Sequence, residues 1–354
     1  MTSQKVTESR STLGNQHSMR NKLSHMTAVP LLMLLCGGSL VNAIVDSDNY
    51  VHHPEAIKFI DEMTSKHQFD RQQLASLFAK AEKKQSILDA IARPAEKTKP
   101  WSEYRKIFVN EQRIEQGVEF WKKNAAALKR AETEFGVPAQ IIVAILGVET
   151  RYGRNIGSYR VVDALSTLAF DYPNRAPFFR SELEHFLLLT REQKKDPLEL
   201  IGSYAGAMGY GQFMPSSYRE FSVDFNGDGF NDIWNNEEDA IGSVANYFKQ
   251  HGWMSGQPIT TMATVKDGFD RTILNEKLEP TRSLTVLESL GYLGEQSFPK
   301  DNLATAMELS GDDGMQYWLG LTNFYVITRY NNSQLYAMAV FQLSEIVKQR
   351  YQSS

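Results

Sequence analysis

Apolar residues recur every three or four positions along most of this chain, which is the spacing of one buried face of an α-helix. The first such segment begins at Pro54, and shorter ones follow at residues 74–78 and 87–91. The pattern stops at residues 94–100, a stretch rich in Lys and Pro that we interpret as a linker. These segments predict a helical region at the start of the chain.

Beyond the linker the helical pattern is longer and more apolar. Ser102 is placed to cap a helix that starts there, and a long amphipathic helix is predicted over about residues 111–135. Gly136 is a typical helix stop, and Pro138 suits the first turn of the next helix.

The rest of the chain predicts further helices and a few strands. Helices are expected at 161–168, 176–191, from 215, 239–250, 284–290 and 333–350, and strands at 303–309 and 324–328. Otherwise we expect residues 262–301 to be irregular. The predicted fold class is α+β, mainly α-helical, with a small β element.

The most apolar predicted helix ends in a single carboxylate. Residues 141–148 are aliphatic or glycine, and Glu149 follows them directly. Where little water is present, desolvation raises the pKa of a carboxyl group and makes it a general acid near neutral pH. The other interpretation is a glutamate that reaches solvent where its helix ends, and this stretch alone favours it because unpartnered carboxylates are seldom buried.

A glycine-rich segment and an acidic loop follow. Residues 202–211 contain four glycines, which let the backbone approach a ligand closely, and Gln212 comes next. This segment fits the floor of a sugar-binding cleft or a packing loop between helices. Residues 224–232 place side-chain oxygens and one glycine as in the start of an EF-hand loop, but Asn235 replaces the closing glutamate. A residue of 237–239 could close the loop, so we expect a weak calcium site or a polar turn without an ion.

The N-terminal residues predict export. Basic residues at 20–25 precede an apolar block at 28–35 and a V-x-A site that ends at Ala43, as in a secretory signal peptide. Met19 or Met26 could be the true start. The only cysteine, Cys36, lies in this segment, and the leucines before it match a lipoprotein signal poorly. A mature chain without cysteine excludes a thiol nucleophile and fits a bacterial envelope compartment.

Composition and motif searches exclude several function classes. The net charge is -4, so no overall basic field favours nucleic acid. The chain contains no H-E-x-x-H zinc motif, no phosphate-binding G-x-x-x-x-G-K loop and no G-x-S-x-G nucleophile elbow.

Four motifs in order resemble the family of membrane-bound lytic murein transglycosylase B. They are GVETRYG at 147–153, GSYAGAMGYGQFMPSSY at 202–218, DFNGDGFNDIW at 224–234 and SVANYFKQHGW at 243–253. The resemblance runs from about Trp101 to the C-terminal helix and more loosely back to Pro54. It implies a lysozyme-like catalytic core, with a signal peptide at 1–43, a helical region at 44–100 and a catalytic region at 101–354.

The resemblance also implies roles for single residues. Glu149 would be the only catalytic acid and base, cleaving the bond between N-acetylmuramic acid (MurNAc) and N-acetylglucosamine (GlcNAc) and leaving a 1,6-anhydro ring. Ordinary glycosidases use two carboxylates, whereas here the sugar would supply the nucleophile. Matched positions that would contact sugar or line the cleft are Tyr104, Ser203, Gln212, Tyr247, Tyr330 and Asn331, and those of a structural calcium loop are Asp224, Asn226, Asp228 and Asp239.

We therefore expect a periplasmic monomer that acts on peptidoglycan glycan strands without a cofactor for catalysis and does not bind nucleic acid. An outer-membrane lipoprotein anchored through Cys36 is the alternative location. Two other functions stay open: a hydrolytic muramidase of goose-lysozyme type and a peptidoglycan-binding protein with little activity. The intact Glu149 argues against the second. Other cell-wall enzymes as partners stay undecided.

Overall fold

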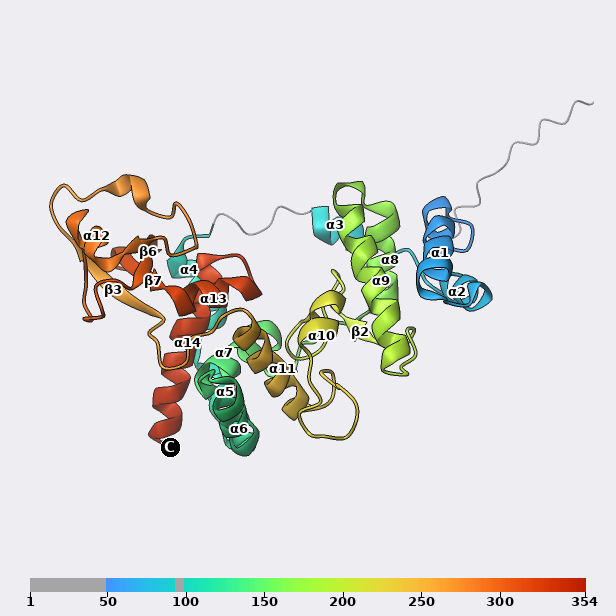
Figure 1. Ribbon diagram of the computed structural model, residues 1–354, viewed down its shortest axis with the longest axis horizontal. Coiled ribbons are helices and arrows are strands. Elements are labelled where there is room, and N and C mark those ends of the chain that lie inside the picture. Colours follow the sequence, from blue (N-terminus) through green and yellow to red (C-terminus); the bar gives the residue numbers. More distant parts are fainter. Residues whose placement is uncertain (1–48, 93–98) are drawn as a thin grey trace, which may run out of the picture. The chain divides into compact units, whose positions relative to one another are not determined.

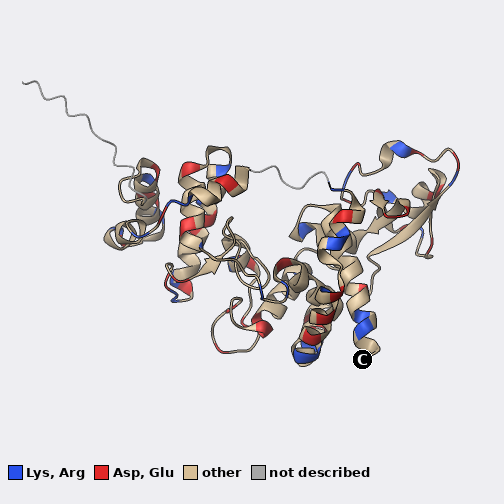
Figure 2. Cartoon of the chain, turned by 180° about the vertical axis from the view of Figure 1, so that it is seen from behind, with Lys and Arg blue, Asp and Glu red and all other residues tan. Residues whose placement is uncertain are grey.

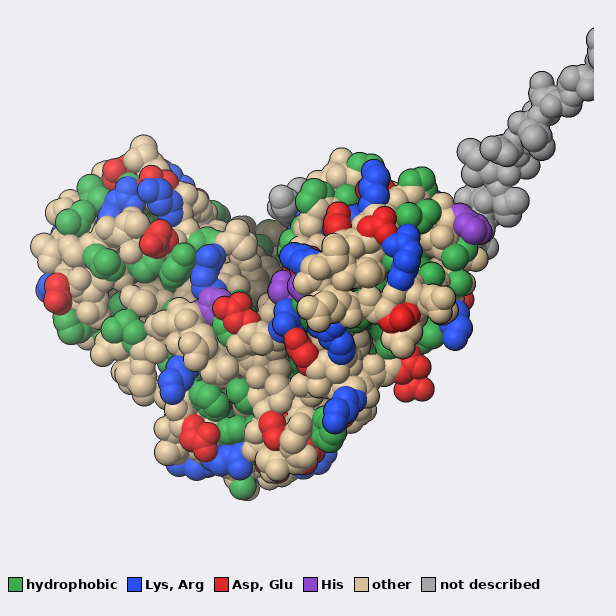
Figure 3. All heavy atoms as spheres, turned by 45° about the vertical axis from the view of Figure 1, so that its right-hand side comes forward, with side chains coloured by type: hydrophobic (Ala, Val, Ile, Leu, Met, Phe, Trp, Pro, Cys, Tyr) green, Lys and Arg blue, Asp and Glu red, His purple; other side chains and the backbone are tan. Residues whose placement is uncertain are grey.

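The computed structural model describes residues 49–92 and 99–354 (Figure 1). The predicted signal peptide, with Cys36, and most of the predicted linker lie outside the described residues. Acidic and basic side chains alternate over the helices and loops without a large patch of one sign in the views of Figures 2 and 3. This distribution agrees with the small net charge of -4.

Helices make up most of the described chain, as the apolar periodicity predicts. They are α1 (Pro54–His67), α2 (Arg71–Phe78), α3 (Gln85–Ala92), α4 (Trp101–Phe108), α5 (Glu111–Lys123), α6 (Ala125–Phe135), α7 (Ala139–Thr150), α8 (Val161–Asp171), α9 (Ala176–Glu192), α10 (Pro215–Phe221), α11 (Glu237–Gln250), α12 (Leu284–Ser289), α13 (Thr322–Tyr330) and α14 (Gln334–Gln352). Two short 3₁₀ turns, η1 (Pro173–Arg175) and η2 (Arg271–Ile273), complete the helical elements.

The strands form two antiparallel sheets. The larger sheet has five strands in the order β4-β6-β7-β3-β5, namely β4 (Arg282–Ser283), β6 (Leu303–Gly311), β7 (Gly314–Leu321), β3 (Thr260–Val265) and β5 (Tyr292–Gly294). Its longest pair, β6 and β7, is a hairpin that closes between Gly311 and Gly314. The smaller sheet joins β1 (Tyr159–Arg160) to β2 (Ile201–Gly202).

Three apolar cores hold these elements. The first core joins α4–α7 to α11, α13 and α14, and the second joins α1–α3 to α8–α10 and the glycine-rich loop. The third lies between the five-stranded sheet, α12 and the 3₁₀ turn η2. Tyr330 packs against both the first and the second core, so the end of α13 marks the place where they meet.

Helix α7 is apolar on all sides because it crosses the first core, where all but one of its residues from Ile141 to Thr150 are buried. No single helix in the described part of the chain is long and apolar enough to cross a membrane. Helices α6 and α7 reach that length and composition only as a pair, and they meet at an angle of 114°.

Two predictions about α4–α6 are wrong in detail. Ser102 lies inside the first turn of α4, and the capping position is Pro100, which offers no side-chain hydrogen bond. The long helix predicted over residues 111–135 is two helices that are separated at Asn124. The Asn124 amide donates hydrogen bonds to the Phe120 carbonyl (3.1 Å) and to Glu237 (2.8 Å), so a tertiary contact stabilises the break.

Two predictions in the C-terminal third also fail. Residues 324–328 form part of α13 and not a strand, although their β-branched and aromatic side chains favour strands. The first core buries Phe324 and Ile327, which lie three positions apart on one helix face. Residues 262–301 are not merely irregular, since they contribute to three strands of the larger sheet. The strand at 303–309 and the helix at 284–290 are confirmed as β6 and α12.

Close packing around Tyr152 yields a first testable prediction. A Cβ atom added at Gly147 of α7 would lie 2.5 Å from the Tyr152 hydroxyl, and one at Gly117 of α5 would lie equally close. We expect Gly147→Ala to lower the free energy of unfolding by about 1–3 kcal/mol because this buried ring has no room to move. Urea unfolding measures the change. In a Tyr152→Leu background the same substitution should cost clearly less, and an equal cost in both backgrounds would contradict the packing argument.

Candidate active site

Helix α7 ends immediately after Glu149 in an unusual backbone turn. Arg151 and Tyr152 both adopt the left-handed conformation, with φ angles of 53° and 60°. Their amides donate to the carbonyls of Gly147 and Leu146, and the Tyr152 hydroxyl donates to the Arg113 carbonyl at 3.0 Å. Consecutive non-glycine residues in this conformation are costly and persist where the surrounding structure holds them, which is common at functional sites.

The glycine-rich loop at residues 202–211 is hydrogen-bonded to this turn. The Thr150 hydroxyl donates to the Tyr210 carbonyl at 2.8 Å and accepts a hydrogen bond from the Gly153 amide at 3.0 Å. Gly153 has a φ of 83°, and a Cβ atom there would lie 2.2 Å from the Tyr210 ring. Only glycine therefore lets the two segments approach so closely.

Glu149 carries the chemistry that this arrangement offers. It is the one residue of 141–150 that is not fully buried, yet its carboxyl group is enclosed by protein. Desolvation raises its pKa to about 7, and a hydrogen bond from the Tyr336 hydroxyl (2.5 Å) opposes part of that rise. Glu149 can thus hold a proton near neutral pH. It can also lose that proton, because the Tyr336 hydroxyl stabilises the carboxylate by donating a hydrogen bond to it.

Tyrosines from three helices lie around Glu149 and its hydrogen-bond partner Tyr336. Burial raises the pKa of Tyr330 and of Tyr336 well above the usual value, and the negative charge of Glu149 adds to both shifts. Tyr104 of α4 adds further to the shift of Tyr336. The structure therefore brings Tyr330 close to Glu149 and Tyr104 close to Tyr336, and both Tyr104 and Tyr330 were predicted from the sequence.

Tyr247 and Tyr330 form the aromatic side of the site. Their rings meet edge to face with centroids 4.8 Å apart, and Phe213 of the glycine-rich segment contacts both rings. The Tyr330 hydroxyl donates to the Gly211 carbonyl at 2.5 Å, and the Tyr247 hydroxyl donates to the Arg329 carbonyl at 2.6 Å. Both phenols are thereby fixed in orientation.

The remaining predicted sugar contacts lie on the loops beside these tyrosines. Gln212 has a left-handed backbone with a φ of 51°, and its amide donates to the carbonyls of Ile156 (3.2 Å) and Gly209 (3.0 Å). The Ser203 hydroxyl accepts a hydrogen bond from the Ala207 amide at 3.0 Å, which shapes the loop. Asn331 follows the last residue of α13 and is exposed.

The predicted ion loop is built around two carboxylates. Asp224 accepts hydrogen bonds from three amides of residues 227–229, and the buried Asp239 accepts them from three amides of the same loop. Among residues 49–92 and 99–354, no three Asp, Glu, His or Cys side chains are gathered as a metal site. The two carboxylates therefore organise the loop backbone, while the side chains of Asn226 and Asp228 are exposed.

Tyr336 is the functional residue that sequence reasoning missed. It lies in the first turn of α14, whose N-cap is Ser333, and its ring is 2% exposed. The helix was predicted, but nothing in its local pattern marks one buried tyrosine as a partner of a residue 187 positions earlier. Only the packing of α14 against α7 reveals the pair.

The raised pKa of Glu149 yields a second prediction. Because the folded pKa lies near 7 and the usual value is 4.5, this group favours folding fully below pH 4.5 and loses that contribution as pH rises through 7. Glu149→Gln should therefore increase the free energy of unfolding at pH 8 by up to about 3 kcal/mol and change it little at pH 4. Tyr336→Phe should lower the free energy of unfolding at pH 8, because the Glu149 carboxylate then loses its hydrogen-bond donor. Equal effects of Glu149→Gln at both pH values would contradict the assignment.

Comparisons with known proteins show the family to which the chain belongs. The family model of the transglycosylase SLT domain matches residues 52–345. The chain is 45% identical over 320 residues to the membrane-bound lytic murein transglycosylase B of Escherichia coli (strain K12), a match that covers 86% of each chain.

Solved structures extend the match to the fold. The lytic transglycosylase SltB1 of Pseudomonas aeruginosa is 55% identical, with a TM-score of 0.83 over 86% of this chain and 100% of that chain. The Escherichia coli lytic transglycosylase Slt35 in complex with calcium is 46% identical, with a TM-score of 0.79 over 85% of this chain and 95% of that chain. The predicted mainly helical α+β fold with a lysozyme-like core is confirmed. The chain belongs to the transglycosylase SLT domain family and is a lytic murein transglycosylase.

Proposed function

We propose that Glu149 acts twice in a cleavage of peptidoglycan that consumes no water. As a neutral acid it donates its proton to the oxygen that links MurNAc to GlcNAc, and the bond from that oxygen to C1 of MurNAc breaks. The resulting carboxylate accepts the proton of the C6 hydroxyl on the same MurNAc, whose oxygen then bonds to C1. The products are a free GlcNAc hydroxyl and a 1,6-anhydro-MurNAc end.

The observation that carries this proposal is the enclosed, solitary carboxyl of Glu149. Burial and the Tyr336 hydrogen bond account for its raised pKa, and no charge from a second carboxylate contributes to the shift. A hydrolase that uses two carboxylates needs the second one as a nucleophile or to activate water. A single group with a pKa of about 7 can serve as the acid in one step and the base in the next.

The tyrosine and loop contacts support a site for a sugar chain. Tyr104 and Tyr330 are partly exposed and offer ring surfaces, the buried Tyr247 supports the Tyr330 ring, and the glycine-rich loop offers backbone groups for hydroxyl and acetamido substituents. Ser203, Gln212 and Asn331 are the proposed polar contacts. We place the enzyme in the periplasm after cleavage behind Ala43, as a monomer, with anchoring through Cys36 as the alternative.

The products formed from whole murein sacculi test the reaction. We expect mass spectrometry to show muropeptide ends that are one water lighter than hydrolysed ends. Glu149→Gln should lower the rate by about 10²–10⁴-fold, because an amide cannot donate the proton. Glu119→Gln is the matched control, since Glu119 is exposed and pairs with Arg154 at 3.8 Å outside the site. Products of hydrolysed mass would instead favour a muramidase.

The loop at residues 224–239 is proposed to bind a structural Ca²⁺ ion. Asp224, Asn226 and Asp228 supply the hard oxygen atoms that calcium prefers, and Asp239 is the proposed closing carboxylate. The charge of Asp224 adds to burial in raising the pKa of Asp239, so a cation between them would relieve a repulsion. A structure of the related Slt35 in complex with calcium also supports the proposal.

Calcium removal and two matched variants test this loop. Adding calcium to chelator-treated protein should raise the melting temperature without changing kcat, since a ligand that binds only the folded state stabilises it. Asp228→Asn should abolish the calcium effect and otherwise be mild. Asp239→Asn should lower the melting temperature with or without calcium, because its carboxylate accepts three backbone amides. A melting temperature that does not change when calcium is added would contradict the proposed calcium site.

A further inference from the structure

A histidine at the end of α11 stacks on the aromatic side of the site. His251 directly follows the last residue of α11 and lies four positions after Tyr247, so the two side chains share one face of the helix. Their rings are stacked, with centroids 4.0 Å apart and planes 21° from parallel. The proposed proton transfers of Glu149 assign no role to this histidine.

A hydrogen bond and a second ring hold His251 in place. Its Nδ1 lies 2.7 Å from the Tyr247 carbonyl oxygen, which can only accept, so Nδ1 donates this hydrogen bond. The ring of Phe221 in α10 contacts the His251 ring with centroids 4.9 Å apart. His251 is partly exposed, and these contacts nevertheless fix the orientation of its ring.

Tyr247 connects His251 to the tyrosine that lies closest to the proposed sugar site. The Tyr247 ring is 8% exposed, and it meets the partly exposed Tyr330 ring edge to face with centroids 4.8 Å apart. Because protein interiors are close-packed, a buried ring that loses a stacked neighbour moves into the space that opens. Loss of the His251 ring would therefore shift Tyr247, and Tyr330 with it.

We propose that His251 is a positioning residue for sugar binding, whose ring supports Tyr247 and thereby sets the ring surface that Tyr330 presents to the glycan strand. This inference rests on the proposed contact between Tyr330 and sugar. Stacked and edge-to-face ring pairs have preferred geometries, so the three rings in sequence fix the orientation of the exposed one. A change at His251 should weaken substrate binding and leave the proton transfers of Glu149 unaffected.

A role in ending helix α11 is the alternative explanation for His251. A histidine near a helix C-terminus can stabilise the helix by donating to one of the last carbonyls. Gly252 follows with a φ of 88°, as is common after the end of a helix. In that case the hydrogen bond to the Tyr247 carbonyl would matter, and the ring of His251 would not.

Two variants separate the ring of His251 from its hydrogen bond. His251→Asn keeps an amide that can donate to the Tyr247 carbonyl but removes the ring, so we expect KM for glycan strands to rise about three- to tenfold and kcat to change less than about twofold. His251→Phe keeps a flat ring and loses the donor, so it should have a KM close to that of the wild type and a lower melting temperature. Initial rates of anhydro-end release from soluble glycan strands give both constants.

His185→Asn is the matched control. His185 is also a partly exposed histidine, and it lies on α9, where its Nδ1 accepts a hydrogen bond from Arg219 at 2.8 Å. The same exchange of imidazole for amide should leave KM and kcat unchanged there, because His185 contacts none of the three rings.

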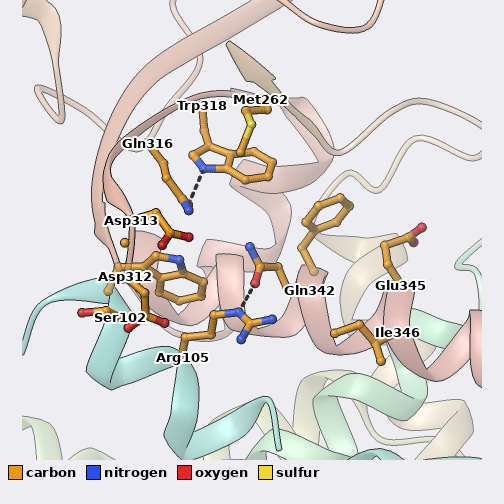
Figure 4. Close-up of a pocket in the computed structure, with 13 residues that line it drawn as sticks. Ser102, Arg105, Met262, Asp312, Asp313, Gln316, Trp318, Gln342, Glu345 and Ile346 are labelled. Carbon is orange, nitrogen blue, oxygen red and sulfur yellow. Dashed lines mark hydrogen bonds between the residues drawn. The ribbon is translucent and has the colours of Figure 1, made fainter. Parts of the chain in front are cut away.

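A second control lies in the cavity of about 470 Å³ between α4, β3, the β6–β7 hairpin and α14 (Figure 4). There the Trp318 indole donates to Gln316 at 3.4 Å, so an aromatic ring again has one polar partner. None of the three rings of the proposal lines this cavity. Gln316→Ala should therefore leave KM unchanged, whereas it would raise KM if the strand bound in this cavity.

The outcomes decide the proposal separately from the proposed function. A wild-type KM in His251→Asn overturns the role of His251, and so does an equal rise of KM in His251→Asn and His251→Phe. If the wild-type enzyme releases no anhydro ends, the proposed function fails, and binding then tests His251 alone. Glu149→Gln protein is titrated calorimetrically with the same strands, with and without His251→Asn. A Kd that rises about three- to tenfold supports the proposal, and an unchanged Kd or no binding overturns it.

Discussion

The enclosure of one carboxyl group is the constraint on which the site depends. Helix α7 has to be apolar on nearly every side to cross the first core, and its last residues before the turn place Glu149 where water is scarce. Desolvation then raises the pKa to about 7, while the Tyr336 hydroxyl keeps the ionised form within reach. Without the Tyr336 hydroxyl, the buried carboxylate form of Glu149 would be higher in free energy. Without burial, Glu149 would be ionised at neutral pH.

The surroundings of Glu149 are rigid because two cores meet there. Tyr330 packs against both cores, and its hydroxyl holds the glycine-rich loop through the Gly211 carbonyl. Thr150 ties the same loop to the end of α7. Strained left-handed residues at Arg151, Tyr152 and Gln212 are stable in this setting since neighbouring hydrogen bonds hold them. Rigidity of this kind suits the proposed mechanism, in which Glu149 faces two reacting oxygens in turn.

The hydroxyl that donates to Glu149 belongs to a neutral phenol, that of Tyr336. A neutral partner has a physical advantage, because a cation beside Glu149 would lower its pKa and remove the proton that the proposed first step needs.

The sequence by itself determined the features that depend on residues close together in the chain. Apolar periodicity located most helices, Gly136 and Pro138 marked the boundary before α7, and four ordered motifs identified the family. Tertiary structure alone decided the rest. Residues 324–328 have strand-like side chains but are helical because the first core buries one helix face, and Asn124 breaks a helix through a contact with Glu237. The Glu149–Tyr336 pair joins residues 187 positions apart, and no local pattern encodes such a distant contact.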